Sequence, residues 1–158
     1  MQLILFDIDG TLVDSGGAGT RSLNLAFREL FFLEDAFHSI SMAGKTDTQI
    51  MKEGLLKHDI SMDGGLDAVI RAYLKYLQRE INNNRRHIKP GIYELLEILQ
   101  PLKERSEQRS KDVLLGLLTG NLERGARIKS NPSSSMNISR QAPSGAMMRT
   151  ETNSSQLL

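Results

Sequence analysis

An apolar run that ends in two acidic residues constrains the fold of this chain more than any other feature. The segment LIL at 3–5 leads directly into FDIDGTL at 6–12. Side chains two residues apart in an extended chain point to the same side, so we expect Asp7 and Asp9 to face one pocket and the residue between them to face the core. Gly10 lacks a Cβ and permits a sharp exit. The pattern predicts a buried strand that opens into a catalytic loop.

A second apolar run predicts a neighbouring strand. The segment VLLGLL at 113–118 also ends in a polar turn, TGN at 119–121. Both runs are almost continuously apolar, which is typical of strands covered on both faces in a parallel sheet. Open α/β sheets bind ligands beyond the carboxyl ends of their strands, so we expect Thr119 to lie near Asp7 if the strands are neighbours.

The chain between these strands is mostly helical by its apolar periodicity. A polar break, NNNRRH at 82–87, separates the last of these helices from the ones before it. Apolar stripes predict helices over about 18–32, 50–56, 66–77 and 91–102.

This arrangement predicts an α/β protein with an inserted α-helical cap. The parallel-sheet core is expected at 1–14 and 85–129, and the cap at 15–84. After that point serine is frequent and apolar periodicity stops, so we expect a disordered or non-native tail at 130–158.

Composition narrows the function classes. The chain has 158 residues, 39% of them hydrophobic, enough for one core with a modest insertion. A net charge of +1 with scattered basic residues favours neither nucleic acid nor an anionic membrane surface as a partner. The lack of cysteine excludes disulfides and thiolate metal sites and fits a cytoplasmic location. No apolar run approaches the length of a membrane span, so we expect a small-molecule partner and no membrane.

The motifs resemble those of the haloacid dehalogenase superfamily of aspartate-dependent phosphohydrolases, in its phosphoglycolate-phosphatase-like branch with a helical cap. The resemblance covers residues 1 to about 129 and depends on DIDGT at 7–11, TGN at 119–121 and GKTD at 44–47. It implies a Rossmann-like parallel-sheet core, which we expect to be incomplete in this chain. It also implies a Mg²⁺-dependent hydrolase of small phosphorylated metabolites that works through an aspartyl-phosphate intermediate.

The resemblance assigns a role to each residue of these motifs. Asp7 is the expected nucleophile, and Asp9 is expected to protonate the leaving alkoxide and later to deprotonate water. Dehalogenating relatives need no such proton donor, so Asp9 favours phosphate esters over organohalides. The Asp7 carboxylate and the Asp9 backbone carbonyl would hold Mg²⁺, which prefers oxygen ligands. Thr119 would donate a hydrogen bond to a phosphoryl oxygen, with support from the amides of Gly120 and Asn121.

Several of these segments have a purely structural interpretation as well. Thr119 could simply end a strand. The segment KTD at 45–47 could cap the helix after it, or it could contact the substrate, with Lys45 as the candidate binding residue. The segment SGGAG at 15–19 is interpreted as a hinge between core and cap rather than as a phosphate cradle. The histidines lack ligand spacing, and RRH at 85–87 is interpreted as a solvated face.

The last part of the chain departs from the resembled family. Relatives carry a third motif, a Lys or Arg that neutralises the phosphate, and a fourth, an acidic cluster that completes the metal site. Glu151 is the only acidic residue after Lys129, and neither motif is found there. Lys129 or Lys45 could replace the basic group, but nothing replaces the metal ligands. We therefore expect impaired turnover, and an unpaired apolar edge on the first strand.

A frameshift near Lys129 would explain this departure. When the codons of residues 133–158 are read from their third base, one permitted back-translation resembles the segment after GARIK in phosphatase relatives and restores an arginine. We expect the coding DNA further on to encode a GDxxxD-like strand in that frame. Two other interpretations of the chain stay open: a non-catalytic phosphate-binding or interaction module, and a phosphotransferase or mutase on the same scaffold.

Overall fold

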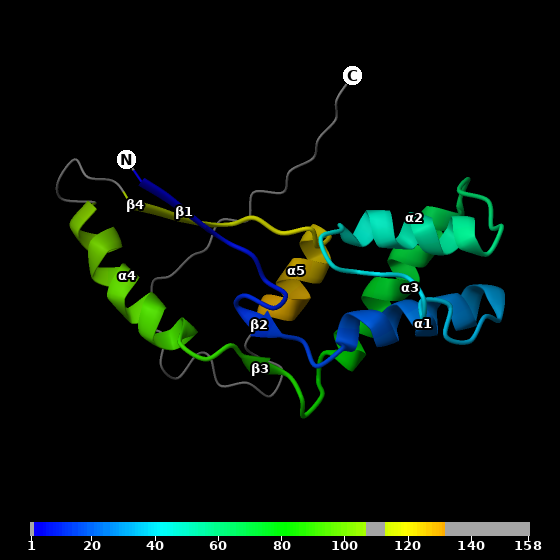
Figure 1. Cartoon of the computed structure of the whole chain (residues 1–158), viewed down its shortest axis with the longest axis horizontal. Coiled ribbons are helices and arrows are strands. Elements are labelled where there is room, and N and C mark those ends of the chain that lie inside the picture. The colour runs from blue at the N-terminus through cyan, green and yellow to red at the C-terminus, as the bar shows by residue number, and fades with distance from the viewer. Residues whose placement is uncertain (1, 107–112, 132–158) are drawn as a thin grey trace, which may run out of the picture.

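The computed structural model of the chain describes residues 2–106 and 113–131 (Figure 1). The tail expected from residue 130 lies outside these residues, except that Ser130 still belongs to a helix and Asn131 comes directly after it. The elements, in chain order, are β1 (Gln2–Phe6), β2 (Val13–Asp14), α1 (Ala18–Phe31), α2 (Asp47–Lys57), α3 (Gly65–Glu80), β3 (His87–Ile88), α4 (Ile92–Ser106), β4 (Val113–Leu117) and α5 (Glu123–Ser130).

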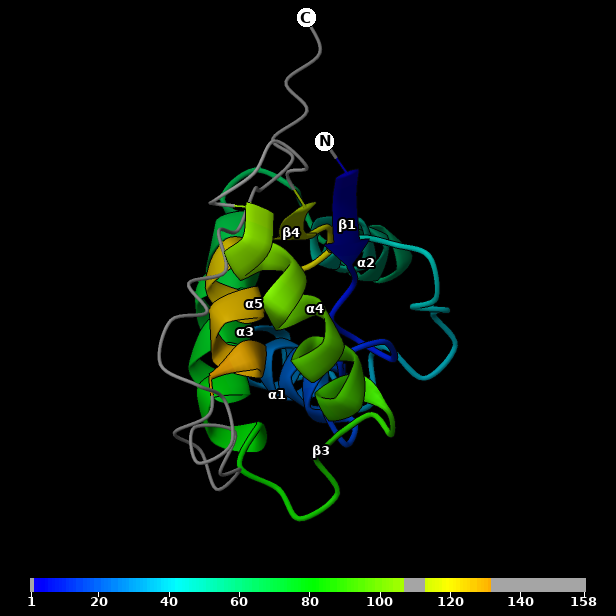
Figure 2. The same cartoon turned by 90° about the vertical axis from the view of Figure 1, so that its left-hand side faces the viewer.

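Strands β1 and β4 lie side by side and run parallel, as Figures 1 and 2 both show. Gln2 is opposite Val113 and Phe6 is opposite Leu117, so the two strands end at the same edge. The predicted α/β architecture, a parallel sheet with helices inserted between its strands, is confirmed. The other edge of β1, which we expected to be unpaired, has no partner strand among the described residues.

In the described part of the chain, helices cover one face of this small sheet. Phe6 and Leu117 are buried on that face against Leu99 of α4 and Ala126 of α5. On the opposite face Leu3 is 58% exposed, and Leu5, Leu114 and Leu118 are each about half exposed. The expectation that both faces would be covered is therefore wrong for the described residues, because α4 and α5 both pack on the same side.

Helices α1, α2 and α3, which belong to the segment expected as the cap, pack together beside the sheet (Figure 1). Their buried side chains form an apolar cluster separate from that of the sheet. Phe27 of α1 is a fully buried member of this cluster and makes edge-to-face contacts with two other rings. Its centroid lies 4.7 Å from that of Phe37 and 5.2 Å from that of Phe31. Such offset aromatic contacts add to the stabilisation from burial alone. None of the helices that the structure describes combines the length and apolar character needed to cross a lipid bilayer.

Two very short strands stand where the chain passes between the sheet and the cap. Val13 of β2 pairs with Ile88 of β3 in an antiparallel ladder that the sequence did not predict. Beside it, Arg86 is only 7% exposed and donates a hydrogen bond to the carbonyl of Lys129 at 2.7 Å. The interpretation of the segment at 85–87 as a solvated face is therefore wrong for Arg86.

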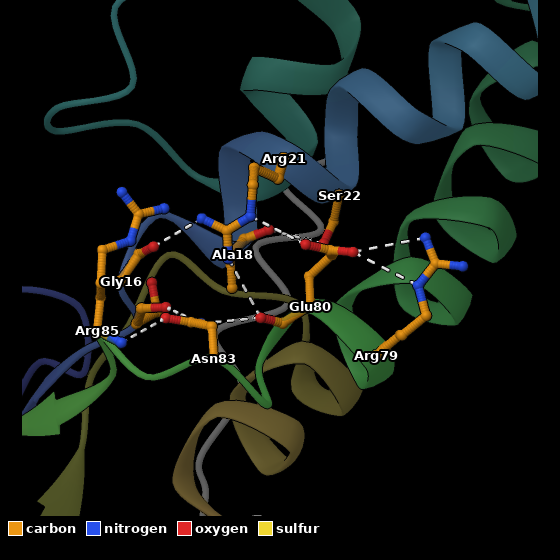
Figure 3. A network of polar contacts seen from close by, with 9 residues as sticks. Gly16, Ala18, Arg21, Ser22, Arg79, Glu80, Asn83 and Arg85 are labelled. Atoms are coloured by element: carbon orange, nitrogen blue, oxygen red, sulfur yellow. Dashed lines mark hydrogen bonds and ion pairs between the residues drawn. The ribbon is translucent and has the colours of Figure 1, made fainter.

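A polar network joins the two chain segments that connect sheet and cap (Figure 3). Arg21 of α1 donates to the carbonyl of Gly16 at 2.7 Å and to a carboxylate oxygen of Glu80 at 2.9 Å. Asn83 donates from Nδ2 to the carbonyl of Ser15 at 3.1 Å. The outgoing and returning segments are thus hydrogen-bonded to each other, at the place where we expected a hinge.

Candidate active site

The turn after β1 presents its two aspartates to solvent and its apolar residues to the core. Phe6 is 7% exposed and Ile8 is fully buried, whereas Asp7 and Asp9 are both exposed. The residue after them, Gly10, has a φ of +80°, which favours glycine. The two acids therefore point to the same side and Ile8 to the other, as expected for an extended chain.

Asp9 forms a bridge with Val13 whose two hydrogen bonds come from the residues on either side of Asp9. The amide of Gly10 donates to the carbonyl of Val13 at 2.9 Å, and the amide of Val13 donates to the carbonyl of Ile8 at 2.9 Å. Neither bond uses the amide or the carbonyl of Asp9. The Asp9 carbonyl thus lies in an ordered turn but accepts neither of these two hydrogen bonds.

The carboxylate of Asp9 is fixed by two donors from the other end of the described chain. Lys129 of α5 donates from Nζ, and Asn121 from Nδ2, to Oδ2 of Asp9, each at 2.7 Å. Lys129 also donates to Oδ1 of Asn121, which closes a three-residue cluster. The Lys129 side chain is only 5% exposed, so this ion pair is screened by solvent far less than a surface pair.

The polar turn after β4 lies beside the acidic turn. The amide of Leu118 donates to the carbonyl of Phe6 at 2.9 Å, which extends the pairing of β1 and β4 into this turn. Thr119 Oγ1 accepts hydrogen bonds from Asn121, from Nδ2 at 2.7 Å and from the amide at 3.3 Å. The hydroxyl proton of Thr119 is therefore available for another acceptor.

These two turns and the cap surround a pocket of about 810 Å³. The sheet side supplies the acidic turn, the polar turn and Lys129, and the cap side supplies residues of α1, α2, α3 and the loop before α2. Every residue singled out as a site candidate from the sequence lines this pocket: Asp7, Asp9, Lys45, Thr119, Gly120 and Asn121.

The cap docks on the polar turn through the first residue of α2. The amide of Asp47 donates to the carbonyl of Gly120 at 2.8 Å, and its Oδ2 accepts from the amide of Leu122 at 3.0 Å. A Cβ on Gly120 would lie 3.0 Å from the carbonyl oxygen of Lys45, which is closer than side chains normally come. Glycine at 120 thus allows the two chain segments to cross in contact.

Burial of Asp47 changes its protonation equilibrium. Its removal from water raises the pKa of Asp47, and the charge of Lys129 opposes this rise. Burial also raises the pKa of Tyr73 well above its usual value, with a further contribution from the charge of Asp47. The Tyr73 phenol consequently stays protonated at neutral pH beside the Asp47 carboxyl group.

The loop before α2 combines a helix cap with an ion pair. Thr46 Oγ1 accepts from the amide of Gln49 at 3.2 Å, and the amide of Thr46 donates to Oε1 of Gln49 at 2.9 Å, so the capping interpretation is confirmed for Thr46. Lys45 also reaches the pocket, but its Nζ lies 2.6 Å from Oε2 of Glu53. Its charge is therefore already paired within the cap.

Comparison with known families identifies the family to which the chain belongs. Residues 4–124 match the family model for haloacid dehalogenase-like hydrolases. The chain belongs to the haloacid dehalogenase-like hydrolase family. No curated protein sequence matches the chain.

Solved structures of low sequence identity share the fold. A hydrolase from Pseudomonas syringae superposes with a TM-score of 0.59 at 20% identity, over 94% of this chain and 60% of that one. A predicted phosphoglycolate phosphatase from Haemophilus somnus 129pt superposes with a TM-score of 0.51 at 20% identity, over 78% of this chain and 53% of that one. This chain thus spans little more than half the length of these two hydrolase-fold proteins.

The oxygen atoms of the acidic turn fit a magnesium ion of the kind this hydrolase family implies. The carboxylate of Asp7 faces the pocket, and the carbonyl of Asp9 accepts neither of the two hydrogen bonds described for the turn. Mg²⁺ is commonly bound by one or two carboxylates, with water and substrate phosphate completing its shell. Among the residues that the structure describes, no group of three or more histidine, cysteine or acidic side chains gathers around such a site.

Asp47 and Tyr73 line the pocket but were not among the site candidates chosen from the sequence. Asp47 was considered as part of the KTD segment, which could cap a helix or contact the substrate, and Tyr73 as one apolar residue of a helical stripe. Both signals describe local structure, whereas the contact of Asp47 with Leu122 joins segments far apart in the chain. Lys129, named as a possible substitute for the missing basic group, is brought to Asp9 by α5.

Proposed function

We propose that this chain carries the site of a Mg²⁺-dependent hydrolase of small phosphate monoesters that works through an aspartyl-phosphate intermediate. One observation carries the proposal: Asp7 and Asp9 face the same pocket as Thr119, and Asp9 is held by Lys129 and Asn121. Family membership supports hydrolysis, and the pairing of a free carboxylate with a second, oriented one supports phosphoryl transfer.

In the first step a carboxylate oxygen of Asp7 attacks phosphorus and the bond from phosphorus to the ester oxygen breaks. Asp9 gives its proton to that departing oxygen, which leaves as an alcohol. The hydrogen bonds from Lys129 and Asn121 both end on Oδ2 of Asp9, so Oδ1 is the oxygen that would take up a proton and give it to the leaving group. Lys129 and Asn121 would therefore act on this step by fixing the direction of Oδ1.

In the second step a water molecule attacks the phosphorus of the aspartyl-phosphate. Asp9 takes a proton from this water, and the bond between phosphorus and the Asp7 oxygen breaks, which regenerates the carboxylate and releases phosphate. Thr119 would donate its hydroxyl proton to a phosphoryl oxygen, since Asn121 contacts Oγ1 only as a donor. The amide of Gly120 would add a second donor in the same turn.

A magnesium ion held by the Asp7 carboxylate and the Asp9 carbonyl would offset the charge that builds up between the phosphate and the two acids. Among the described residues, no three acidic, histidine or cysteine side chains gather closely enough to complete such a site. We therefore infer that turnover by this chain is slow, because electrostatic stabilisation is commonly the largest single contribution to catalysis.

Hydrolysis of p-nitrophenyl phosphate tests the proposal. We expect slow release of p-nitrophenol that requires Mg²⁺ and is abolished in Asp7→Asn, which keeps the size of the side chain but not the nucleophile. Asp67→Asn, an exposed position in the first turn of α3, makes the same chemical change away from the pocket, and its rate should match the wild type. Hydrolysis that survives in Asp7→Asn would show that Asp7 is not the nucleophile.

A non-catalytic phosphate-binding module is the second candidate. It is favoured by the absence of a third acidic ligand among the described residues of the pocket. Calorimetric titration with inorganic phosphate and Mg²⁺ separates the two functions. Binding without any hydrolysis of p-nitrophenyl phosphate would favour the module, whereas slow Asp7-dependent hydrolysis favours the enzyme.

A further inference from the structure

The charged side chains that line the pocket are unequally divided between the two signs. Acidic residues outnumber basic ones, and each basic residue lies on a different side of the pocket. The acidic residues are Asp7, Asp9, Asp14 and Asp47, and the basic residues are Lys45 and Lys129.

Each of the two lysines is already paired with a carboxylate. Lys129, on the sheet side, lies 2.7 Å from Asp9, and Lys45, on the cap side, lies 2.6 Å from Glu53. The phosphate of a substrate would take up whatever positive charge remains on the sheet side. Among the described lining residues, the cap side then offers no unpaired cation to a second anionic group on the substrate.

Part of the cap wall of the pocket, formed by Leu23, Met42 and Ile50, is instead apolar. Leu23 and Ile50 are 3% and 5% exposed and line the pocket as part of the buried cap cluster. Met42 lies beside them in the pocket lining and accepts a hydrogen bond at its sulfur from the hydroxyl of Thr20 at 3.3 Å. An uncharged leaving group can be buried against this wall, whereas an anion would lose hydration there without gaining a partner.

We propose that the pocket takes phosphate monoesters whose leaving group is uncharged or cationic, and that it discriminates against leaving groups that carry a carboxylate. The inference rests on the proposed function and names the substrate class of the same site. Discrimination arises in the cap, because the pairing of Lys45 with Glu53 removes the cation that would otherwise meet a second anion.

Binding of three two-carbon esters to Asp7→Asn tests the proposal without any need for turnover. The esters are 2-hydroxyethyl phosphate, 2-aminoethyl phosphate and 2-phosphoglycolate, which differ in the charge of the group beyond the phosphate. Titration calorimetry in Mg²⁺ should show the first two binding about tenfold more tightly than the third, a modest effect for like charges a few ångströms apart in water. Equal or tighter binding of 2-phosphoglycolate, or binding of none of the three, overturns the proposal.

Freeing Lys45 gives a second, independent test. In Asp7→Asn combined with Glu53→Gln, we expect 2-phosphoglycolate to gain affinity and the gap to the neutral ester to shrink severalfold. Glu29→Gln is the matched control, because it breaks an ion pair of similar length, with Lys75 at 2.8 Å, on residues that do not line the pocket. A gap that Glu53→Gln leaves unchanged would overturn the role given to the Lys45–Glu53 pair.

The outcomes also separate this inference from the proposed function. If the esters bind in the expected order and the wild-type chain hydrolyses none of them, the proposed hydrolysis fails and the ligand class stands. If the wild-type chain hydrolyses p-nitrophenyl phosphate through Asp7 but 2-phosphoglycolate binds best, the ligand class fails and the proposed hydrolysis stands.

Discussion

Lys129 is the charged donor to the carboxylate of Asp9. Its ammonium group is almost fully buried and bridges Asp9 and Asn121. Removal of this group would leave Asn121 to hold Oδ2 of Asp9 without the help of a charge. The proton that Asp9 transfers would then start from a less well-defined position.

Lys129→Met is therefore expected to lower kcat for p-nitrophenyl phosphate by about 100-fold, within the usual contribution of an oriented general acid. Steady-state rates as a function of pH measure the effect, because a merely structural change would not alter the shape of the profile. Lys75→Met, which breaks a pair on the outside of the cap, is the control and should leave kcat unchanged. An unaltered kcat in Lys129→Met would contradict the orienting role.

Asp47 predicts a pH dependence of stability with a definite sign. Burial raises the pKa of Asp47 above its usual 3.8, so the folded state binds this proton more tightly than the unfolded chain does. The contribution of Asp47 to the free energy of unfolding is full below that usual value, and it is lost as the pH rises through the folded-state pKa. Asp47→Asn should remove this loss.

Urea unfolding at a series of pH values from about 4 to about 7 measures this effect. The free energy of unfolding of Asp47→Asn relative to that of the wild type should rise with pH over this interval. Asp67→Asn, an exposed acid in the first turn of α3, is the control for the loss of a charge at a helix start. Parallel curves for Asp47→Asn and the wild type would refute the effect of burial.

At the scale of single residues, sequence predicts what local geometry determines. Asp7 and Asp9 could be assigned to one pocket because the alternation of side chains in an extended chain is a local rule. Asp47 and Tyr73 could not, because their place depends on how two cap helices dock on the turn after β4. The sequence shows that Asp47 starts a helix and that Tyr73 lies on the apolar face of another. It does not show which segments these helices contact.

Among the elements, α2 depends on a glycine in its interior. A Cβ on Gly54 would lie 2.6 Å from Cζ of Phe37 and 2.9 Å from Cζ of Phe27. Real side chains do not approach so closely, so α2 can lie against these two rings only because position 54 has no side chain.

Gly54→Ala should therefore destabilise the fold by about 1–3 kcal/mol, the usual effect of overpacking, despite the better helix propensity of alanine. Gly65→Ala in α3 is the matched control, since its Cβ would come no closer than 3.7 Å to another group. That substitution should be neutral or stabilising. Urea unfolding of both variants checks the prediction, and equal effects at the two sites would contradict it.

The connection between α1 and α3 depends on the pair formed by Arg21 and Glu80. The hydrogen bond from Arg21 lowers the pKa of Glu80 below its usual 4.5, so this pair stabilises the fold fully above that value. The contribution is lost as the pH falls through the folded-state pKa. Both side chains are partly exposed, at 32% and 21%, which limits the size of the effect.

Arg21→Met is expected to lower the free energy of unfolding at neutral pH by about 1 kcal/mol, and by less in acid. Arg79→Met is the control, because Arg79 contacts the same carboxylate at 3.4 Å from a more exposed position. Its effect should be smaller and nearly independent of pH. Equal losses in the two variants would show that the geometry of the Arg21 contact is unimportant.

The long elements could be predicted from apolar periodicity, and the short ones could not. The four longest helices appear near the positions that their apolar stripes indicate. Strands β2 and β3 have two residues each, too few for any period. Helix α5 was missed because it buries Gly125, Ala126 and the stem of Lys129 rather than large apolar side chains.

For the molecule as a whole, the two faces of the sheet should respond differently to the same substitution. Leu114 is 49% exposed and Leu117 is 5% exposed, although both belong to β4. Leu117→Thr should destabilise the fold by about 2–4 kcal/mol, as expected for removing apolar atoms from a core. Leu114→Thr should change the free energy of unfolding by less than about 1 kcal/mol.

Urea unfolding of these two variants, with dye binding to monitor exposed apolar surface, checks this prediction. Dye binding should decrease in Leu114→Thr relative to the wild type. A loss of stability in Leu114→Thr as large as that in Leu117→Thr would mean that the Leu114 face is covered. The sequence could not distinguish the two faces of the sheet. An apolar run has apolar side chains on both faces and does not show which face the helices cover.

The contact of Ser15 with Asn83 brings the outgoing and returning ends of the cap together, beside the short ladder of β2 and β3. A chain that departs and comes back at one point can exchange everything in between for a shorter or longer segment, because closing such a loop depends only weakly on its length. Asp7 and Asp9, the acids that would perform the chemistry, lie outside this exchangeable segment, in the turn after β1. Reaction and substrate preference can thus evolve as separate modules of a single polypeptide.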